Sequence, residues 1–210
     1  MNETPAGDYL EPYRRAVERF GASFPAMLWH SRDSQIVRFD VMIAMVGFDE
    51  SVILDVGCGT GDFAARLIER KIPFKSYVGV DALSEMIQSA GKRGFNRCRF
   101  ETHDVLLDPD AMSAYEPDFI CFSGTLNTME EQTARSLIGR AFMAALQGVV
   151  FNFLSDRCHR RWLDRDLHPA RRFNTVRWLD WAMDLSSRVT FTQEYLDGHD
   201  ATILIRHEEE

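Results

Sequence analysis

The segment that most constrains the fold of this chain is residues 52–63, which read VILDVGCGTGDF. It begins with a short apolar run that does not alternate, which is typical of a strand covered on both faces. Three glycines at every second position follow, and the next residues have the apolar spacing of a helix. Because glycine lacks a Cβ atom, its backbone can approach a bound ligand closely. The segment therefore predicts a buried strand, a ligand-binding turn and a helix.

The same alternation of strand and helix recurs along the chain. Five strand patterns, separated by amphipathic helices, are found at residues 52–56, 76–80, 97–102, 117–122 and 149–154. This order predicts an α/β fold with a parallel sheet and helices on both faces. The end of the chain differs. Strand patterns at 188–195 and 201–205 are joined by an Asp197-Gly198 turn and predict an antiparallel hairpin.

Two helix starts carry capping signals. Asp8, with Glu11 three residues later, is expected to cap a short helix, and Thr128 with Glu131 has the spacing of a capping box. The helix after Thr128 is expected to bury one apolar face, formed by Ala134, Leu137, Ile138, Ala141, Phe142 and Ala145. A length of 210 residues suits one domain with a small addition. We therefore expect a helical cap or arm over residues 1–30 and one domain over residues 31–210.

Composition excludes several classes of protein. A net charge of −8 argues against nucleic acid as a general partner, because phosphate backbones favour basic surfaces. Four cysteines lie far apart without a CxxC pair, which favours reduced thiols in a cytoplasmic protein over a disulfide or a metal site. No secretory signal and no apolar run long enough to span a membrane are found in the sequence. A soluble cytoplasmic protein without a metal is therefore expected.

The glycine spacing narrows the choice of ligand. A dinucleotide-binding turn has the pattern GxGxxG, and its third glycine would fall at position 62. Asp62 occupies that position, and the third glycine is Gly61. A negative charge there disfavours a pyrophosphate and favours a cationic or zwitterionic ligand. The alternative, in which the three glycines merely shape a tight turn, stays open at this point.

Acidic and polar residues follow the other predicted strands at the same edge of the sheet, where such folds bind ligands. Asp81 ends the second strand and suits two ribose hydroxyls, or else caps a helix. Asp104 and Val105 follow the third strand and suit the edge of an adenine ring, although Asp104 is also a residue that forms turns. Ser123 ends the fourth strand and closes the crevice from the other side.

Five segments in this order resemble the class I S-adenosylmethionine (SAM)-dependent methyltransferases: residues 52–63, 77–87, 100–106, 117–127 and 149–154. The resemblance covers about residues 31–207, and the tail 168–206 is similar to that of small stand-alone bacterial methyltransferases. It implies a Rossmann-like sheet of seven strands in the order 3-2-1-4-5-7-6, with the last strand antiparallel. It also implies SAM as the methyl donor and S-adenosylhomocysteine (SAH) as the product.

The resemblance assigns roles to individual residues. Gly57, Gly59 and Gly61 correspond to positions that line the methionine part of SAM, and Asp55 to the position that engages its amino group. Asp81 corresponds to the ribose-binding position and Asp104 to the one that faces adenine. The remaining residues of the expected cofactor site are Cys58, Ala82, Leu83, Val105 and Ser123.

The acceptor of the methyl group is indicated less clearly. His30, Asn127 and His159 are weak candidates for catalysis, and each has an ordinary structural alternative: a packed or exposed histidine, or a turn asparagine. Residues 123–127 read SGTLN and lack the prolines that adenine-N6 and glutamine methyltransferases often carry. Catalysis by the protein can be limited to alignment and proton removal, so no fixed residue type is required.

Residues 155–172 form the second informative region, with six arginines against three aspartates. We hypothesise that this region faces a small, anionic acceptor, with His159, Trp162 and His168 as contacts. The alternative is a solvated charged surface. The sequence thus predicts methyl transfer to a small molecule. Protein or RNA methylation, a non-catalytic SAM-binding protein and, more distantly, an NAD-dependent oxidoreductase are the alternatives. A homo-oligomer is compatible with every one of them.

Overall fold

The computed structural model describes residues 9–208 of the chain, and these residues contain one seven-stranded sheet. The strand order is β3-β2-β1-β4-β5-β7-β6. Strands β1 to β5 pair in parallel, whereas β7 runs antiparallel to both β5 and β6. The strand bounds are Val52–Val56, Ser76–Asp81, Cys98–Thr102, Phe119–Phe122, Gly148–Leu154, Val189–Thr192 and Asp200–Arg206. The predicted order and the antiparallel seventh strand are confirmed.

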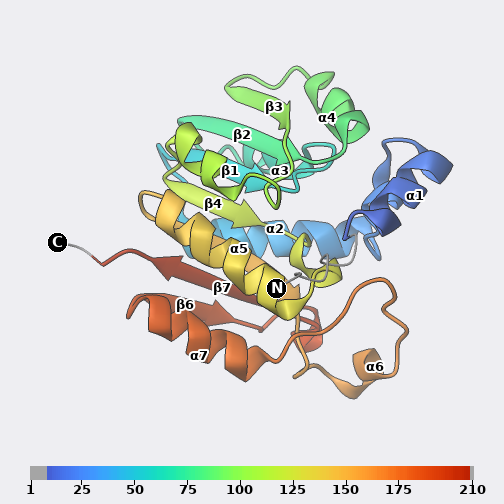
Figure 1. The fold of residues 1–210 in the computed structure, drawn as a ribbon, viewed down its shortest axis with the longest axis vertical. Coiled ribbons are helices and arrows are strands. Elements are labelled where there is room, and N and C mark those ends of the chain that lie inside the picture. The colour runs from blue at the N-terminus through green and yellow to red at the C-terminus, as the bar shows by residue number, and fades with distance from the viewer. Residues whose placement is uncertain (1–8, 209–210) are drawn as a thin grey trace, which may run out of the picture.

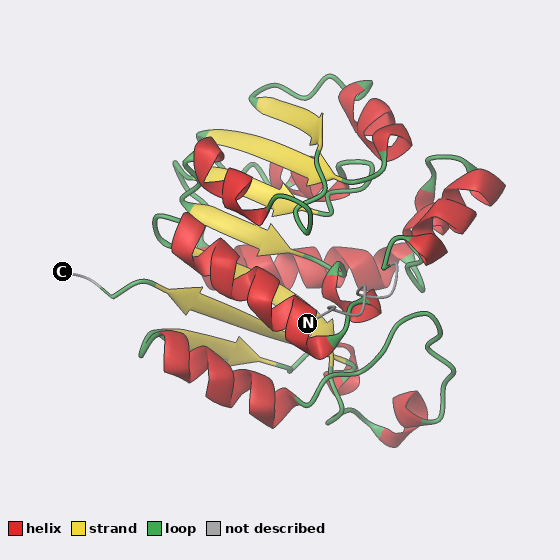
Figure 2. Cartoon of the chain, viewed as in Figure 1, coloured by secondary structure: helices red, strands yellow, loops and turns green. Residues whose placement is uncertain are grey.

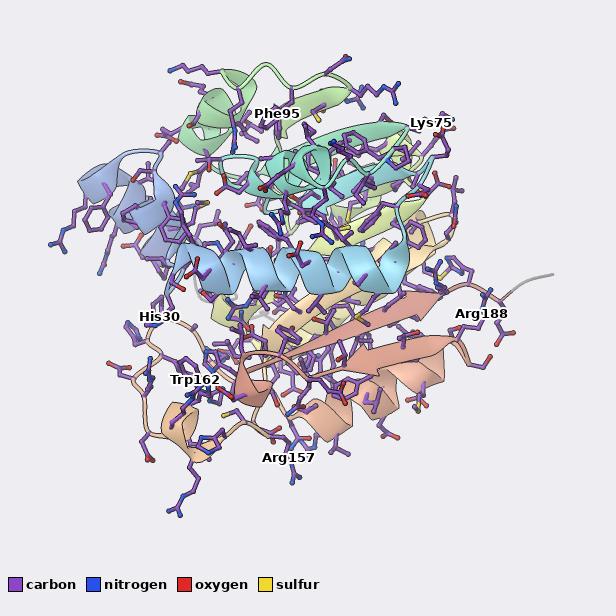
Figure 3. The ribbon with its side chains drawn as sticks, turned by 180° about the vertical axis from the view of Figure 1, so that it is seen from behind. His30, Lys75, Phe95, Arg157, Trp162 and Arg188 are labelled. Carbon is purple, nitrogen blue, oxygen red and sulfur yellow. The ribbon has the colours of Figure 1, made fainter. Side chains whose placement is uncertain are left out.

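Helices cover both faces of the sheet. The α-helices α1 to α7 are Glu11–Phe20, Arg32–Val46, Asp62–Glu69, Ser84–Gly91, Glu131–Ala144, Arg160–Leu163 and Thr175–Leu185. The 3-10 turns η1 to η4 are Phe24–Met27, Pro109–Tyr115, Leu126–Thr128 and Leu196–Gly198. Helices α5 and α7 lie in front of the sheet in Figure 1, and Figure 3 shows α2 on the opposite face. Among residues 9–208, no helix combines the length and the apolar character that crossing a membrane requires.

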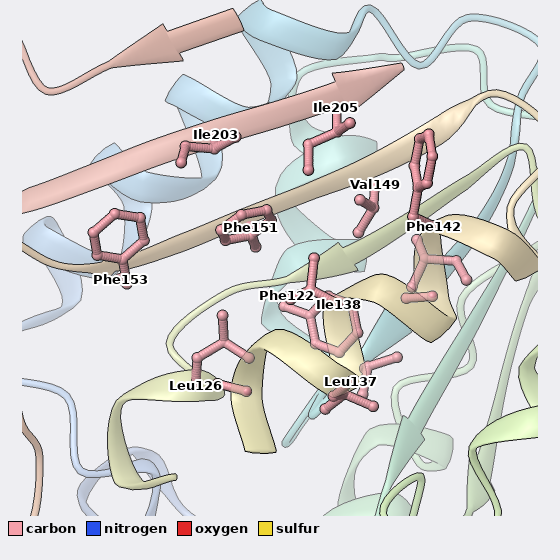
Figure 4. Packing of buried hydrophobic residues seen from close by; sticks show 14 of the residues in the cluster. Phe122, Leu126, Leu137, Ile138, Phe142, Val149, Phe151, Phe153, Ile203 and Ile205 are labelled. Atoms are coloured by element: carbon pink, nitrogen blue, oxygen red, sulfur yellow. The ribbon is translucent and has the colours of Figure 1, made fainter. Parts of the chain in front are cut away.

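Each face of the sheet has its own core. On the face covered by α5 and α7, Phe151 and Phe153 pack against Trp178 with ring centroids 5.3 Å apart in each pair. Figure 4 shows the buried side chains of α5 against β4, β5 and β7. All six residues of the predicted apolar face of α5 are buried. On the other face, Phe39 of α2 packs on Phe63 of α3. Central strands β4 and β5 are buried along their whole length, which explains why their sequences are almost entirely apolar and do not alternate.

The secondary structure in Figure 2 differs from the sequence prediction mainly at helix starts. The predicted capping box is wrong, because α5 begins at Glu131 after Glu130 without a side-chain cap, and Thr128 lies in the separate turn η3. Helix α1 begins after Leu10, which also makes no side-chain cap bond. Asp8 and the other residues at positions 1–8 of the predicted cap or arm over residues 1–30 lie outside the described residues.

Candidate active site

A cavity lies at the carboxyl ends of β1, β2 and β4, bordered by α1 and η1. Its empty volume is about 890 Å³, counting the part open to solvent. Figure 1 shows α1 beyond the edge toward which the arrows of β2 and β4 point. Nine of the eleven residues predicted to bind the cofactor line it: Asp55, Gly57, Cys58, Gly59, Asp81, Ala82, Leu83, Val105 and Ser123.

The turn after β1 requires glycine for steric reasons. Gly57 has a φ of 75°, and a Cβ atom there would lie 2.6 Å from the hydroxyl oxygen of Thr125. That hydroxyl cannot move freely, because it donates to the carbonyl of Val56 at 2.8 Å. The backbone N–H groups of Gly57 and Cys58 both donate to the carbonyl of Val80, at 2.8 and 3.0 Å. The turn is therefore held closely against β2 and leaves the cavity open above it.

Asp81 joins this turn to the loop after β2. One carboxylate oxygen accepts from the backbone N–H of Gly59 at 3.0 Å, and the other accepts from the N–H of Leu83 at 2.9 Å. Burial raises the pKa of Asp81 above its ordinary value, while these two hydrogen bonds lower it. Each carboxylate oxygen keeps a second lone pair, so the group can still accept hydrogen bonds from a ligand in the cavity.

Asp55 is the second acidic side chain that lines the cavity, and it is almost completely buried. Its carboxylate accepts a hydrogen bond from the hydroxyl of Tyr77. The pKa of Asp55 is raised to about 7, mainly by burial and also by the nearby charge of Asp81, while the bond from Tyr77 opposes this shift. A cation placed beside Asp55 would stabilise the ionised form of this carboxyl group.

Two residues predicted to bind the cofactor do not line the cavity. Gly61 faces the other way, since a Cβ atom there would lie 2.9 Å from the ring of Phe100. A carboxylate oxygen of Asp104 accepts from the hydroxyl of Tyr9 at 2.7 Å and from the backbone N–H of Leu106 at 3.0 Å. Asp104 thus forms the turn that was its alternative interpretation, and it also holds the residue before α1 against the sheet.

Asp62, whose negative charge argued against a pyrophosphate ligand, has a positively charged partner in the structure. Asp62 lies outside the cavity lining and pairs with Arg93 at 2.7 Å, while the amide of Gln35 donates to its other oxygen at 3.4 Å. Its negative charge is therefore partly neutralised by a neighbour that no local pattern predicts. The choice of ligand depends on Asp55 and Asp81 more than on Asp62.

A second cavity adjoins the first on the side of β5 and α6. Its empty volume, again including the part open to solvent, is about 1400 Å³. Four residues belong to the linings of both cavities: Tyr13, Met27, Trp29 and Gly124. A Cβ atom on Gly124 would lie 2.6 Å from the ring of Trp29, so the indole sits directly on the backbone after β4. These four residues form the junction between the two cavities.

The three catalytic candidates fall in different environments. His30 is exposed and lines the second cavity, with its ring edge-on to Trp162 at 6.2 Å between centroids (Figure 3). Asn127 also lines it, but its side-chain oxygen accepts from the backbone N–H of Leu154, so it holds the turn after β4 in place. His159 caps α6 through the N–H of Arg161 and lines neither cavity.

Most of the arginine-rich region has structural partners. Arg161 pairs with Asp197, and Arg171 pairs with Glu130 at 2.5 Å. Of the six arginines, Arg165 lines the second cavity, together with the predicted contacts Trp162 and His168. Much of this region is therefore a charged surface, as the alternative interpretation predicted. Its part from Trp162 onward fits the hypothesis of a region that faces the acceptor.

Sequence reasoning missed the residues that α1 and the segments on either side of it contribute, among them Tyr9, Tyr13 and Met27. His103 and Thr125 also line the cavity. They lie beside Val105 and Ser123 in the strand-end segments that the sequence predicts at this crevice. Within residues 9–208, no group of three or more His, Cys, Asp or Glu side chains is placed to hold a metal ion.

Residues 48–147 match the model of a family described as a methyltransferase domain, which covers the glycine turn, Asp55 and Asp81. The chain belongs to the class I SAM-dependent methyltransferases. No curated protein sequence matches the chain.

Solved structures share the fold of this methyltransferase at low identity. Magnesium protoporphyrin IX methyltransferase (ChlM) from Synechocystis PCC 6803 with bound SAH has a TM-score of 0.65 and 14% identity, over 96% of this chain and 97% of that one. A complex of DhpI with SAM and HEP has a TM-score of 0.66 and 16% identity, over 97% and 99% of the two chains. The small RNA methyltransferase HEN1 has a TM-score of 0.68 and 16% identity, over 84% of this chain and 25% of that one.

Proposed function

We propose that SAM binds in the first cavity, with its methionine part over Gly57 and Gly59 and its ammonium group beside Asp55. Asp81 accepts hydrogen bonds from the ribose hydroxyls. Adenine lies toward Ala82, Leu83 and Val105, which are lining residues from two strand ends. The fit is supported by the glycine turn, in which a Cβ atom at Gly57 would clash with Thr125, and by the carboxylates of Asp55 and Asp81 in the lining, of which Asp55 is buried, because they suit a ligand with cationic groups. SAM supplies the activated methyl group when it is bound, and SAH is the product.

We propose further that the acceptor is a small molecule bound in the second cavity. The observation that carries this proposal is the junction at which Tyr13, Met27, Trp29 and Gly124 line both cavities. Methyl transfer is an in-line displacement, so donor and acceptor must approach each other from opposite sides of one point. Two adjoining cavities with a shared wall provide that arrangement. The net charge of −8 is less suited to RNA.

The protein has to exclude water from the junction and orient the acceptor. Burial raises the pKa of Tyr13 to about 12, so its hydroxyl stays protonated and suits a hydrogen-bond donor to the acceptor. His30 is the proposed base for an acceptor that must lose a proton, because it lines the second cavity and its ring is accessible. The positions of Asn127 and His159 support structural roles instead.

The proposed function is tested by measuring SAH binding calorimetrically and transfer of a labelled methyl group to three acceptor pools: small metabolites, peptides and RNA. We expect SAH to bind and label to appear among the small metabolites. We expect Trp29→Ala to reduce that transfer at least about tenfold, and by a larger factor than it weakens SAH binding, because the substitution removes the wall that aligns the acceptor. Label in RNA or peptides alone would support the macromolecular alternative, and SAH binding without transfer would support a non-catalytic protein.

The affinity for SAM is expected to rise with pH through about 7. Asp55 is protonated below its pKa of about 7, and binding a cation beside it must then displace that proton. If the bound form keeps Asp55 ionised, the Kd falls about tenfold between pH 6 and pH 8 and levels off above. Titration calorimetry across this range measures the effect. Asp55→Asn should flatten the curve, and an equally steep curve in that variant would assign the dependence to another group.

A further inference from the structure

We propose that the second cavity accepts a planar aromatic molecule that carries an anionic group, with its ring against Trp29 and its anion toward Arg165. This inference rests on the proposed function, since it treats the second cavity as the acceptor site. It follows from two independent features of the cavity, the rings in its walls and the balance of its charges.

Rings form a large part of the cavity walls: Tyr13, Phe20, Trp29, His30, Trp162, His168 and His199. Trp29 is fixed in position, because its ring sits on the backbone of Gly124 and the guanidinium of Arg38 lies over it at 4.8 Å from the centroid. On the opposite side, Trp162 stacks on His199 with centroids 4.2 Å apart and planes 25° apart. Rigid aromatic walls favour a flat ring, which gains stacking and edge contacts without ordering flexible side chains.

Positive charge exceeds negative charge around this cavity. Arg38 is neutralised by Asp200, with which it forms two hydrogen bonds of 2.6 Å. Arg165 lines the cavity, and its guanidinium lies 4.4 Å from the ring centroid of Trp162. None of the carboxylates in residues 9–208 forms an ion pair with Arg165. Its charge is therefore available to a ligand.

A further cation lies behind the wall. Arg172 donates to the backbone carbonyls of Ser155, Trp162 and His199 and contacts Nδ1 of His199, which are all neutral groups. It has no carboxylate partner within the described part of the chain. The pKa of His199 is lowered to about 3, mainly by burial and also by the positive charges of Arg172, Arg38, Arg165 and His30. The wall at His199 thus lies in a positive field.

One acidic side chain, Asp166, lines the cavity among the described residues. One of its carboxylate oxygens accepts from the backbone N–H of His168 at 2.9 Å, and the residue is exposed to solvent. The negative charge of Asp166 offsets one of the two positive charges of Arg165 and Arg172 and leaves the other without a balancing charge. An anionic substituent would complete this balance, whereas a cationic acceptor would add to an existing repulsion.

The test uses the SAH-loaded protein and three probes: 4-hydroxybenzoate, its neutral analogue 4-hydroxybenzamide, and the non-aromatic anion cyclohexanecarboxylate. Kd values are measured by ligand-observed NMR. We expect 4-hydroxybenzoate to bind at least about fivefold more tightly than either analogue. Arg165→Gln should remove most of the preference over the amide, and Trp29→Leu most of the preference over cyclohexanecarboxylate. Arg160→Gln is the matched control, because Arg160 is exposed in the same region and lines neither cavity.

Equal affinity for the benzoate and the benzamide, a preference that survives Arg165→Gln, or no binding of any probe would overturn the inference. The SAH affinity of each variant is measured in the same samples. If the unsubstituted protein does not bind SAH, the proposed function itself is contradicted. If SAH binds but the Kd values of the three probes do not depend on their charge or on an aromatic ring, this inference alone is contradicted. Arg165 is exposed, so its replacement is not expected to disturb folding.

Discussion

Replacing Asp81 by alanine is expected to raise the Kd for SAH at least about 100-fold, measured by titration calorimetry. The substitution removes the proposed acceptor of the ribose hydroxyls. It also removes the two bonds that hold the backbone of Gly59 and Leu83, both of which line the cavity. Hydrogen bonds to a charged group contribute about 1.5–3 kcal/mol each, and a factor of 100 corresponds to about 2.7 kcal/mol. Loss of one ligand bond together with a looser turn is sufficient for this effect.

Two further variants make the Asp81 experiment specific. Asp81→Asn keeps one oxygen that accepts and should bind SAH with an intermediate affinity, because one of the two backbone contacts can persist. Glu85→Ala removes an acidic side chain from the start of α4, four residues away and exposed, and should leave the Kd unchanged. An Asp81→Ala protein that folds and binds SAH as tightly as the parent would contradict the placement of the ribose.

The sheet was predictable because its central strands are buried on both faces. Strands β1, β4 and β5 therefore carry mostly apolar sequences that do not alternate with polar ones, and the terminal hairpin has its own turn signal. The nine predicted residues that line the first cavity were found for a related reason. The carboxyl ends of adjacent parallel strands meet at one edge, so residues just after these strands must lie together. Helix starts were less predictable, since a cap depends on one side-chain rotamer.

The rest of the site depends on contacts between distant segments. The carboxylate of Asp104 accepts a hydrogen bond from Tyr9, which lies 95 residues earlier in the chain. The negative charge of Asp62 is partly neutralised by Arg93, which follows α4. Nothing local to Asp104 or Asp62 distinguishes these outcomes from ligand binding. The position of Trp29 at the junction likewise depends on Gly124 and Arg38, which the sequence does not place beside it. The lining of the second cavity, where we propose that the acceptor binds, therefore depends on tertiary packing, whereas the lining of the first cavity depends mainly on the strand ends.

Replacing Arg38 by methionine is expected to lower the free energy of unfolding by about 3–5 kcal/mol, because it leaves the carboxylate of Asp200 buried without its partner. Arg38 and Asp200 are 5% and 0% exposed at their side chains, and they join α2 to β7 across 162 residues. Burial raises the pKa of Asp200, and Arg38 opposes that shift. Without Arg38, the folded state holds the proton of Asp200 to a higher pH than the unfolded state does. The stability of the variant should therefore fall as pH rises.

The double variant Arg38→Met/Asp200→Leu separates the two consequences of this pair. Chemical denaturation should show most of the lost stability restored, because an apolar pair of similar volume replaces the unpaired charge. The contact that holds the Trp29 ring in place is not restored, because the guanidinium that lies over this ring is absent in both variants. We therefore expect the double variant to unfold like the parent and bind SAH normally, but to bind 4-hydroxybenzoate more weakly. Recovery of stability and of probe binding together would show that Arg38 supports the fold alone and that Trp29 needs no cation above it.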